Sequence, residues 1–248
     1  LSVKDFCIEN YEKHNNVFVH KSIDLNKKIF RYMPLEYLLS MIASKELYVP
    51  NRSQFPDAVE HGYYENPKYK FQMGLIPKNK KERKFYSEIS ESKYKKEMSA
   101  YNICVSCWTC DDDLTENYLM WKAYGNKSIC CCLETTVNDL VESIEDNGGV
   151  DVLLSKVNYR EEHLNSGSVQ DYVFEKRNYY KDERELRLCV LSQEKKFFLR
   201  INPNRLIKGV TLSPFIGKDV SDALIDEFKD GYKGCNFSVN KSLINEIK

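Results

Sequence analysis

The sequence lacks an excess of charge, flexible residues and long apolar runs. Among its 248 residues, Lys+Arg and Asp+Glu both number 37, so the formal net charge is zero. This balance argues against a protein whose whole surface binds nucleic acid or an acidic membrane, although it allows a local basic patch. With only 10 Gly and 7 Pro, the chain is neither fibrous nor of low complexity. No apolar run approaches the roughly 20 residues of a membrane helix, so we expect no membrane partner.

Several familiar catalytic motifs are also missing. The 4 histidines are scattered singly, so there is no HExxH motif, and neither GxGxxG nor GxSxG occurs. The segment Gly125–Ser128 superficially resembles a phosphate-binding loop, but Met120 stands where the loop needs its first glycine. These absences exclude the common motif-defined peptidases, dinucleotide-binding folds and serine hydrolases.

What is present is typical of a globular protein. Apolar residues make up 42% of the chain and aromatic residues 12%, which is enough for a core without stabilising cross-links. The 9 cysteines cannot all pair within one chain, because their number is odd. We therefore expect reduced thiols and a cytoplasmic protein.

The spacing of the cysteines raises the question of zinc. Cys104, Cys107 and Cys110 form two overlapping CxxC pairs, and Cys130 with Cys132 forms a CxC. The first group lies on a predicted strand, where residues three apart point to opposite faces. Neither Gly nor Pro is present to make the turn that a tetrahedral site needs. The pattern predicts small buried core thiols and no metal site.

The chain is predicted to consist of two parts that differ in character. A polar segment at 1–27, with a short helix at Lys4–Lys13, precedes a single domain at 28–248. Within this domain, Lys28–Met33 reads as a strand that carries an arginine. A charged helical insertion is expected at about 51–101, and its basic stretch Lys78–Lys84 is either a solvated helix face or a phosphate contact.

The hydrophobic periodicity of the domain predicts strands and helices in mixed order. We expect an α+β fold with a mixed, largely antiparallel sheet and flanking helices. The expected strands are Lys28–Met33, Glu46–Pro50, Asn102–Thr109, Ser128–Leu133, Val150–Tyr159, Glu185–Ser192, Lys196–Ile201, Leu206–Leu212 and Phe237–Val239. The expected helices begin at Leu35, Leu114, Val137, Phe174 and Val220.

Two strands carry polar residues in a suggestive pattern. In the segment Lys181–Val190, alternation places Glu183, Glu185 and Arg187 on one face, opposite an apolar face. This row either lines a cleft or forms ion pairs in solvent. In the strand Asn102–Thr109, Ser106 and Trp108 share a face, and the tryptophan either stacks on a planar ligand or packs in the core.

Arg31 is a third candidate, because it lies between Phe30 and Tyr32 in an otherwise apolar strand. A guanidinium in such a place needs a partner, since an unpaired buried charge is costly. A carboxylate of the protein or a phosphate of a ligand would both satisfy it.

The order of these segments resembles DUF2971, a bacterial family of unknown function. The resemblance covers about residues 29–212 and rests on the following pieces: Arg31-Tyr32, Lys45-Glu-Leu-Tyr48, Phe55-Pro-Asp57, Ser106-Cys-Trp108, Met120-Trp-Lys-Ala-Tyr124, Val157-Asn-Tyr159 and Glu183-Arg-Glu-Leu-Arg187.

The layout is also similar to the Arg–Ser–Glu form of the ADP-ribosyltransferase superfamily. That form has an arginine on the first strand, a serine on a middle strand and Glu-x-Glu on a late strand, matched here by Arg31, Ser106 and Glu183-x-Glu185. The similarity implies a split sheet and NAD as the substrate.

The resemblance also implies a role for each site residue. Glu185 would be catalytic, by binding the ribose 2′-hydroxyl of NAD and stabilising the positive charge that develops as nicotinamide leaves. Glu183, also catalytic, would orient or deprotonate the acceptor. Arg31 would bind a phosphate and Ser106 would steady Glu185. Tyr32 or Trp108 would stack on nicotinamide.

The implied function is transfer of ADP-ribose to a protein or nucleic-acid target, in a bacterial toxin or anti-phage effector that an antitoxin or regulatory partner could restrain. Two alternatives remain open. One is a non-catalytic nucleotide-binding or sensing module on the same fold. The other is a metal-dependent nuclease that uses Glu183, Glu185 and Asp57.

Overall fold

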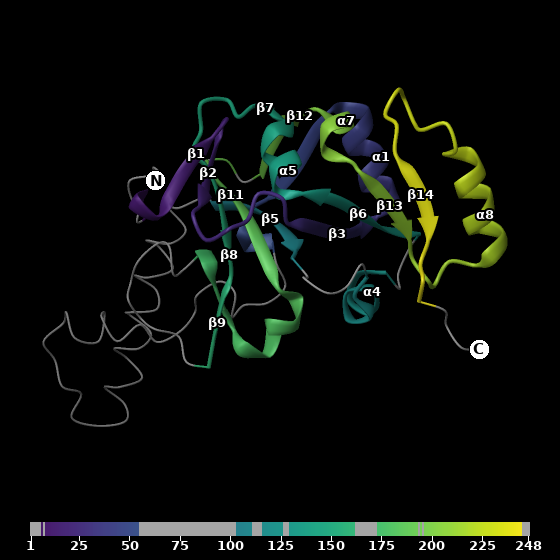
Figure 1. Cartoon of the computed structure of the whole chain (residues 1–248), viewed down its shortest axis with the longest axis horizontal. Helices are drawn as coiled ribbons and strands as arrows, with labels where there is room; N and C mark the ends of the chain where they lie inside the picture. The colour runs from purple at the N-terminus through teal and green to yellow at the C-terminus, as the bar shows by residue number, and fades with distance from the viewer. Residues whose placement is uncertain are drawn as a thin grey trace, which may run out of the picture.

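The computed structural model describes residues 6, 8–54, 103–110, 116–125, 129–161, 173–192, 194 and 196–244 of the chain. Within these residues the protein is a mixed α+β fold built on a nine-stranded sheet, together with a three-stranded and a two-stranded sheet. Figure 1 shows the large sheet running across the molecule with the helices around it. The predicted α+β class with a mixed sheet is confirmed.

The large sheet has the strand order β1-β2-β8-β11-β5-β3-β6-β13-β14. Neighbouring strands are antiparallel, except that β2 pairs with β8 and β13 with β14 in parallel. Its strands are β1 (Tyr11–His14), β2 (Val17–His20), β3 (Lys28–Pro34), β5 (Ile103–Thr109), β6 (Cys130–Thr136), β8 (Val152–Lys156), β11 (Glu185–Leu191), β13 (Gly209–Leu212) and β14 (Ser238–Lys241).

The smaller sheets flank this framework. The three-stranded sheet has the order β4-β12-β7, with β4 (Glu46–Pro50), β12 (Lys196–Ile201) and β7 (Ile144–Asp146). The two-stranded sheet pairs β9 (Asn158–Arg160) with β10 (Glu175–Arg177) in parallel. The short helices of 3-10 type are η2 (Ile8–Asn10), η3 (Arg52–Gln54) and η4 (Asn178–Glu183).

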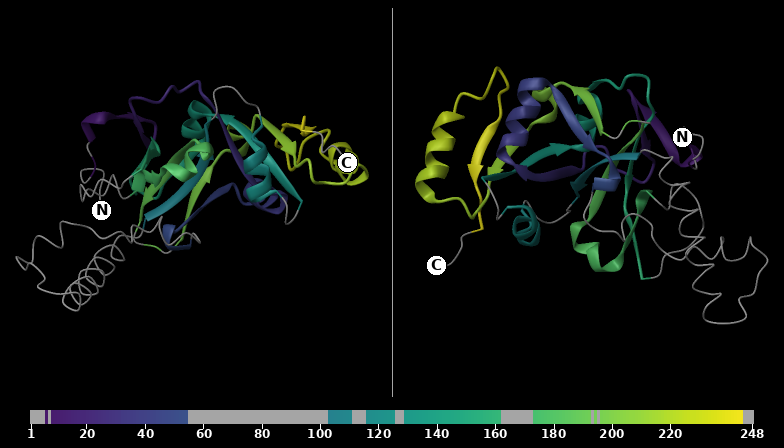
Figure 2. Two further views of the ribbon diagram at one scale, coloured as in Figure 1. Left: turned by 90° about the horizontal axis from the view of Figure 1, so that it is seen from below. Right: turned by 180° about the vertical axis from the view of Figure 1, so that it is seen from behind.

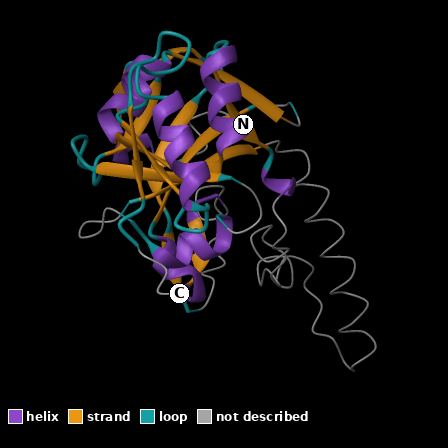
Figure 3. Cartoon of the chain, turned by 90° about the vertical axis from the view of Figure 1, so that its right-hand side faces the viewer, coloured by secondary structure: helices purple, strands orange, loops and turns teal. Residues whose placement is uncertain are grey.

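The helices and the sheet enclose apolar clusters on both sheet faces. The largest cluster lies between the sheet and α1 (Leu35–Ser44), α5 (Val137–Ser143) and α7 (Pro203–Leu206). On the opposite face, α4 (Tyr118–Tyr124) packs through Trp121 against β3 and β6. The last helix is α8 (Lys218–Glu227), beside β14. The views in Figures 2 and 3 show the strands lying between these helices.

The central strands β3 and β5 of the large sheet pair over a short length. β3 pairs with β6 along its whole length, and β5 pairs with β11 along its whole length. Between β3 and β5, by contrast, the described residues give a single register pair, Phe30 with Thr109. The two halves of the sheet therefore diverge beside this pair, which leaves room for side chains from both faces.

Most predicted elements are confirmed, including the strand with Arg31, the helix after it and the strand at 185–191. Two predictions were wrong. The expected helix at Lys4–Lys13 is, in its described part, η2 followed by β1. The expected helix from Phe174 to Tyr180 is largely strand β10 and η4. Both segments are short, and their pairing with distant strands decides their conformation.

The expected polar segment at 1–27 contains the hairpin β1–β2, which joins the large sheet through β8. The charged insertion expected at about 51–101, with Asp57 and Lys78–Lys84, lies outside the described residues from 55 onward. Among the described helices, none combines the length and the apolar character needed to cross a bilayer.

Most of the described cysteines are buried, whereas Cys107 and Cys110 are only partly buried. Cys104, Cys131 and Cys132 are buried in the apolar clusters, as predicted. Cys107 instead lines a pocket beside the center of the sheet. No disulfide joins the cysteines in the described ranges of the chain.

Candidate functional site

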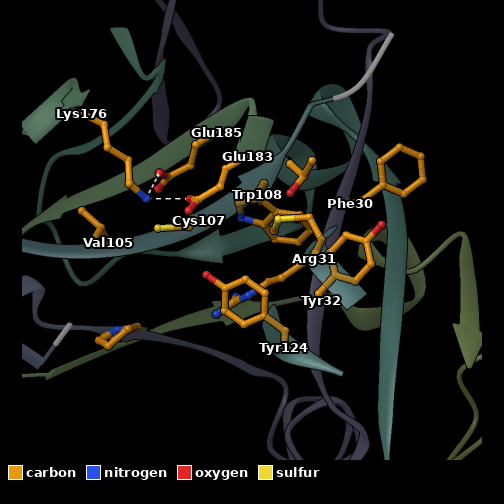
Figure 4. A pocket seen from close by; sticks show the side chains of 13 residues that line it. Phe30, Arg31, Tyr32, Val105, Cys107, Trp108, Tyr124, Lys176, Glu183 and Glu185 are labelled. Carbon is orange, nitrogen blue, oxygen red and sulfur yellow. Dashed lines mark hydrogen bonds and ion pairs between the residues drawn. The ribbon is translucent and has the colours of Figure 1, made fainter. Parts of the chain in front are cut away.

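A pocket of about 160 Å³ lies where β3 and β5 diverge. It brings together five of the six site residues that the sequence predicts. Its walls come from β3, β4, β5, α4, β10, η4 and β11, and they are formed by Phe30, Arg31, Tyr32, Pro50, Val105, Cys107, Trp108, Thr109, Met120, Tyr124, Lys176, Glu183 and Glu185. Figure 4 shows most of these side chains directed into one space.

The limited pairing between β3 and β5 explains how side chains from both faces of the sheet reach the pocket. Arg31 is on the same face of β3 as Ile29 and Met33, which belong to the cluster under α1. Trp108 belongs to the same cluster. Tyr32 belongs to the cluster on the opposite face. Because side chains alternate along a strand, a complete sheet would separate these groups. The gap beside the Phe30–Thr109 pair allows them to meet.

One end of the pocket is acidic. The Nζ of Lys176 lies 2.6 Å from a carboxylate oxygen of Glu183 and 3.4 Å from one of Glu185. Figure 4 shows the lysine pointing at both carboxylates. The ammonium thus sits where a cation shared by the two acids would sit, and no group of three potential metal ligands occurs in the part of the chain that the structure describes.

The two acids reach this end from different local structures. Glu185 is the first residue of β11, whereas Glu183 is the last residue of η4. Arg184 between them has a left-handed backbone (φ 44°), which is unusual for a residue with a side chain and is found at functional sites. The prediction that both acids lie on one strand was therefore wrong, although both line the pocket.

Glu185 is held by a buried arginine. Arg187 donates from Nε to one carboxylate oxygen at 2.7 Å and from Nη2 to the other at 3.0 Å. Burial by itself would raise the pKa of the Glu185 carboxyl, but the charge and hydrogen bonds of Arg187, with the charge of Lys176, lower it to about 2. Glu185 is therefore ionised at neutral pH despite being buried.

The other end of the pocket carries a cation, the guanidinium of Arg31. The guanidinium of Arg31 lies 5.7 Å from the centroid of the Trp108 ring. In the described portion of the chain, no carboxylate forms an ion pair with Arg31. Burial lowers the pKa of this arginine, which is the mark of a charge that has lost part of its hydration. Such a group is suited to bind an anionic ligand.

Two aromatic residues define the shape around Arg31. Trp108 is 1% exposed and belongs to the core, and it also lines the pocket, while its stacking on a ligand stays a prediction. The ring of Tyr32 packs edge-on against Trp121, and its hydroxyl accepts a hydrogen bond from the backbone of Asn117. Tyr32 therefore fixes α4 against the pocket.

Ser106 is the predicted site residue that the structure does not bring to the pocket. It lies opposite Leu188 of β11, whereas Glu185 lies opposite Thr109. Ser106 and Glu185 are therefore on opposite faces of the sheet, and the role of steadying Glu185 was assigned wrongly to Ser106. Its hydroxyl instead accepts a hydrogen bond at 3.1 Å from the indole nitrogen of Trp108.

Replacing Ser106 with alanine should lower the free energy of unfolding by about 1–3 kcal/mol, because the buried indole N–H of Trp108 would lose its acceptor. Urea unfolding followed by tryptophan fluorescence measures this. We expect the titration of the Glu185 carboxyl to be the same in wild type and Ser106→Ala. A change in that titration would contradict the placement of Ser106 on the other face.

Several pocket residues were not predicted from the sequence. Lys176 was missed because its segment was expected to be a helix with no functional pattern. Thr109 follows the predicted residue Trp108, and a lone threonine on a strand carries no signal. Cys107 was predicted to be a core thiol, because its CxxC spacing lies on a strand. Tyr124 is the last residue of α4, and its place at the end of a predicted helix indicates no function.

No model of a known protein family matches the chain, and no curated protein matches it in sequence. The resemblance to DUF2971 and to the ADP-ribosyltransferase superfamily therefore remains a prediction.

Proposed function

We propose that the pocket binds NAD and that the chain cleaves its nicotinamide–ribose bond and transfers ADP-ribose to a protein or nucleic-acid target. The observation that carries this proposal is the convergence of Arg31, Trp108 and Glu185 on one pocket from the adjacent strands β3, β5 and β11. Arg31 and Glu185 are two of the residues on which the resemblance to the ADP-ribosyltransferase superfamily rests, whereas Ser106 faces the other side of the sheet. An ADP-ribosyltransferase-like fold is part of the same proposal.

The charges of the pocket agree with this chemistry. As the bond to nicotinamide breaks, positive charge develops on the ribose, and an ionised carboxylate beneath the sugar stabilises it. Glu185 meets this requirement, since its pKa is lowered to about 2. At the other end, the guanidinium of Arg31 would bind a phosphate of the same ligand.

The size of the pocket limits which part of the ligand enters it. Sites that enclose a ligand of drug size usually have a volume of about 300–1,000 Å³. A pocket of about 160 Å³ is smaller than that, so it suits one half of a dinucleotide. In the proposal the nicotinamide and its ribose enter, beside Trp108 and Glu185, while the adenosine half lies outside.

A second function is favoured by one specific observation. Both oxygens of Glu185 already accept hydrogen bonds from Arg187, and Lys176 approaches one of them. A carboxylate neutralised in this way stabilises a nearby positive charge less strongly than an unpaired one. This pairing favours a module that binds the nucleotide without cleaving it.

The two functions are separated by incubating the purified chain with NAD labelled in the adenosine half, with and without cell lysate, and measuring free nicotinamide and macromolecule-bound label. Nicotinamide release together with bound label is the expected result. Binding of NAD without release would support the module. Neither binding nor release would contradict both, and Mg²⁺-dependent cleavage of nucleic acid without NAD would support the nuclease alternative.

A further inference from the structure

Arg187 is a charged residue that is almost completely buried beside the pocket. Its side chain is 1% exposed. In addition to its two bonds to Glu185, it donates from Nη1 to the backbone carbonyl of Val173 at 2.7 Å. The guanidinium is thus fixed at both ends, by the carboxylate and by the chain that leads into β10.

The two partners of the Arg187–Glu185 ion pair lie differently with respect to the pocket. Glu185 lines the pocket, and Arg187 is not among the residues that line it. The planar guanidinium contacts both carboxylate oxygens, which fixes the rotation of the carboxylate as well as its position. Arg187 therefore lies behind Glu185 as seen from the space that a ligand would occupy.

Lys176 cannot provide the same constraint. Its Nζ is closer to Glu183, at 2.6 Å, than to Glu185, at 3.4 Å. An ammonium group is also a single charged point without the two-pronged geometry of a guanidinium. Lys176 neutralises the acidic end of the pocket, but it leaves the orientation of Glu185 to Arg187.

We propose that Arg187 is a positioning residue that holds the Glu185 carboxylate in the orientation required beneath the ribose of the bound ligand. This inference rests on the proposed function, which it deepens. A buried pair needed for folding alone could be replaced by apolar side chains at little cost. A pair that positions a catalytic carboxylate has to keep the guanidinium fork.

The test compares wild type with Arg187→Lys, which keeps the charge and loses the fork, and with Arg187→Gln as a second variant in case the first does not fold. The matched control is Arg160→Lys, because Arg160 pairs at 2.9 Å with the buried Glu175, which does not line the pocket. For each protein we would measure kcat for nicotinamide release, affinity for NAD, the melting temperature and the pKa of Glu185. The pKa is read by carbon-13 NMR of labelled glutamate, with the signal assigned from Glu185→Gln.

We expect Arg187→Lys to lower kcat roughly 100-fold with little change in NAD affinity. Without the guanidinium fork, the Glu185 carboxylate would move by about 1 Å from its position beneath the ribose. The pKa of Glu185 should rise when the charge-assisted hydrogen bonds are lost. Arg160→Lys should change neither quantity. A variant with lowered melting temperature but unchanged kcat and unchanged pKa would overturn the proposal.

The two proposals can fail separately. If wild type releases no nicotinamide in any lysate, the proposed function is wrong, and the pKa still decides the role of Arg187. A rise of the Glu185 pKa in either Arg187 variant would then support positioning, and an unmoved pKa would overturn it. If neither variant folds, a wild-type pKa of Glu185 in the ordinary range for glutamate would overturn the inference, and a depressed one would support it.

Discussion

Replacing Glu185 with glutamine is expected to lower the rate of nicotinamide release roughly 1,000-fold, while NAD still binds. The amide keeps the size of the side chain and a hydrogen-bond acceptor. It removes the negative charge that would stabilise the sugar as the bond breaks. The effect should therefore fall on kcat, measured by single-turnover release of nicotinamide, and much less on the dissociation constant of NAD.

The substitution also leaves Arg187 without its acidic partner in a buried place, so Glu185→Gln should be less stable. The assay is therefore run well below the melting temperature of the variant. Glu175→Gln is the matched control, because it neutralises a buried glutamate that pairs with Arg160 away from the pocket. Release rates that fall equally in both variants would contradict a catalytic role for Glu185.

Replacing Arg31 with methionine is expected to weaken NAD binding roughly 100-fold, which corresponds to about 3 kcal/mol, because the ligand phosphate would lose its charged partner. The same change should leave the protein as stable as wild type or more so. Among the described residues no carboxylate pairs with Arg31, and its charge is partly desolvated against Trp108. Removing a charge that folding does not need costs little.

Calorimetric titration with NAD and thermal unfolding measure the two effects. Lys28→Met is the control, since Lys28 is on the same strand but forms its ion pair with Glu134 at the surface. A loss of affinity together with a gain or no change in melting temperature would mark Arg31 as a ligand-binding residue. If Arg31→Met unfolds the protein or leaves the affinity unchanged, Arg31 has a structural role.

Much of the framework around the pocket could be predicted from the sequence. The alternation in 185–191 correctly places Leu186 and Leu188 on the opposite face of the strand from Glu185 and Arg187, although all four residues are buried. The strand that carries Arg31 and the helix after it follow from hydrophobic periodicity. These features depend on residues close together in the chain, and local patterns describe them well.

The errors arose where distant segments decide the outcome. Alternation places Ser106 and Trp108 on one face of their strand, but it does not say which face of the neighbouring strand they match. That is fixed by the register between β5 and β11, which puts Glu185 opposite Thr109. In the same way, Lys176 reaches the pocket because β10 pairs with β9, a pairing that no local pattern near residue 176 indicates.

The proposed function requires a dinucleotide to lie between Arg31 and Glu185. The most direct measurement is a crystal structure of the wild-type chain with a NAD analogue whose glycosidic bond cannot be cleaved. We predict that the ribose 2′-hydroxyl lies about 2.6–3.0 Å from a carboxylate oxygen of Glu185 and that a phosphate contacts the Arg31 guanidinium. An analogue bound elsewhere, or a pocket that stays without ligand at saturating concentration, would contradict the account.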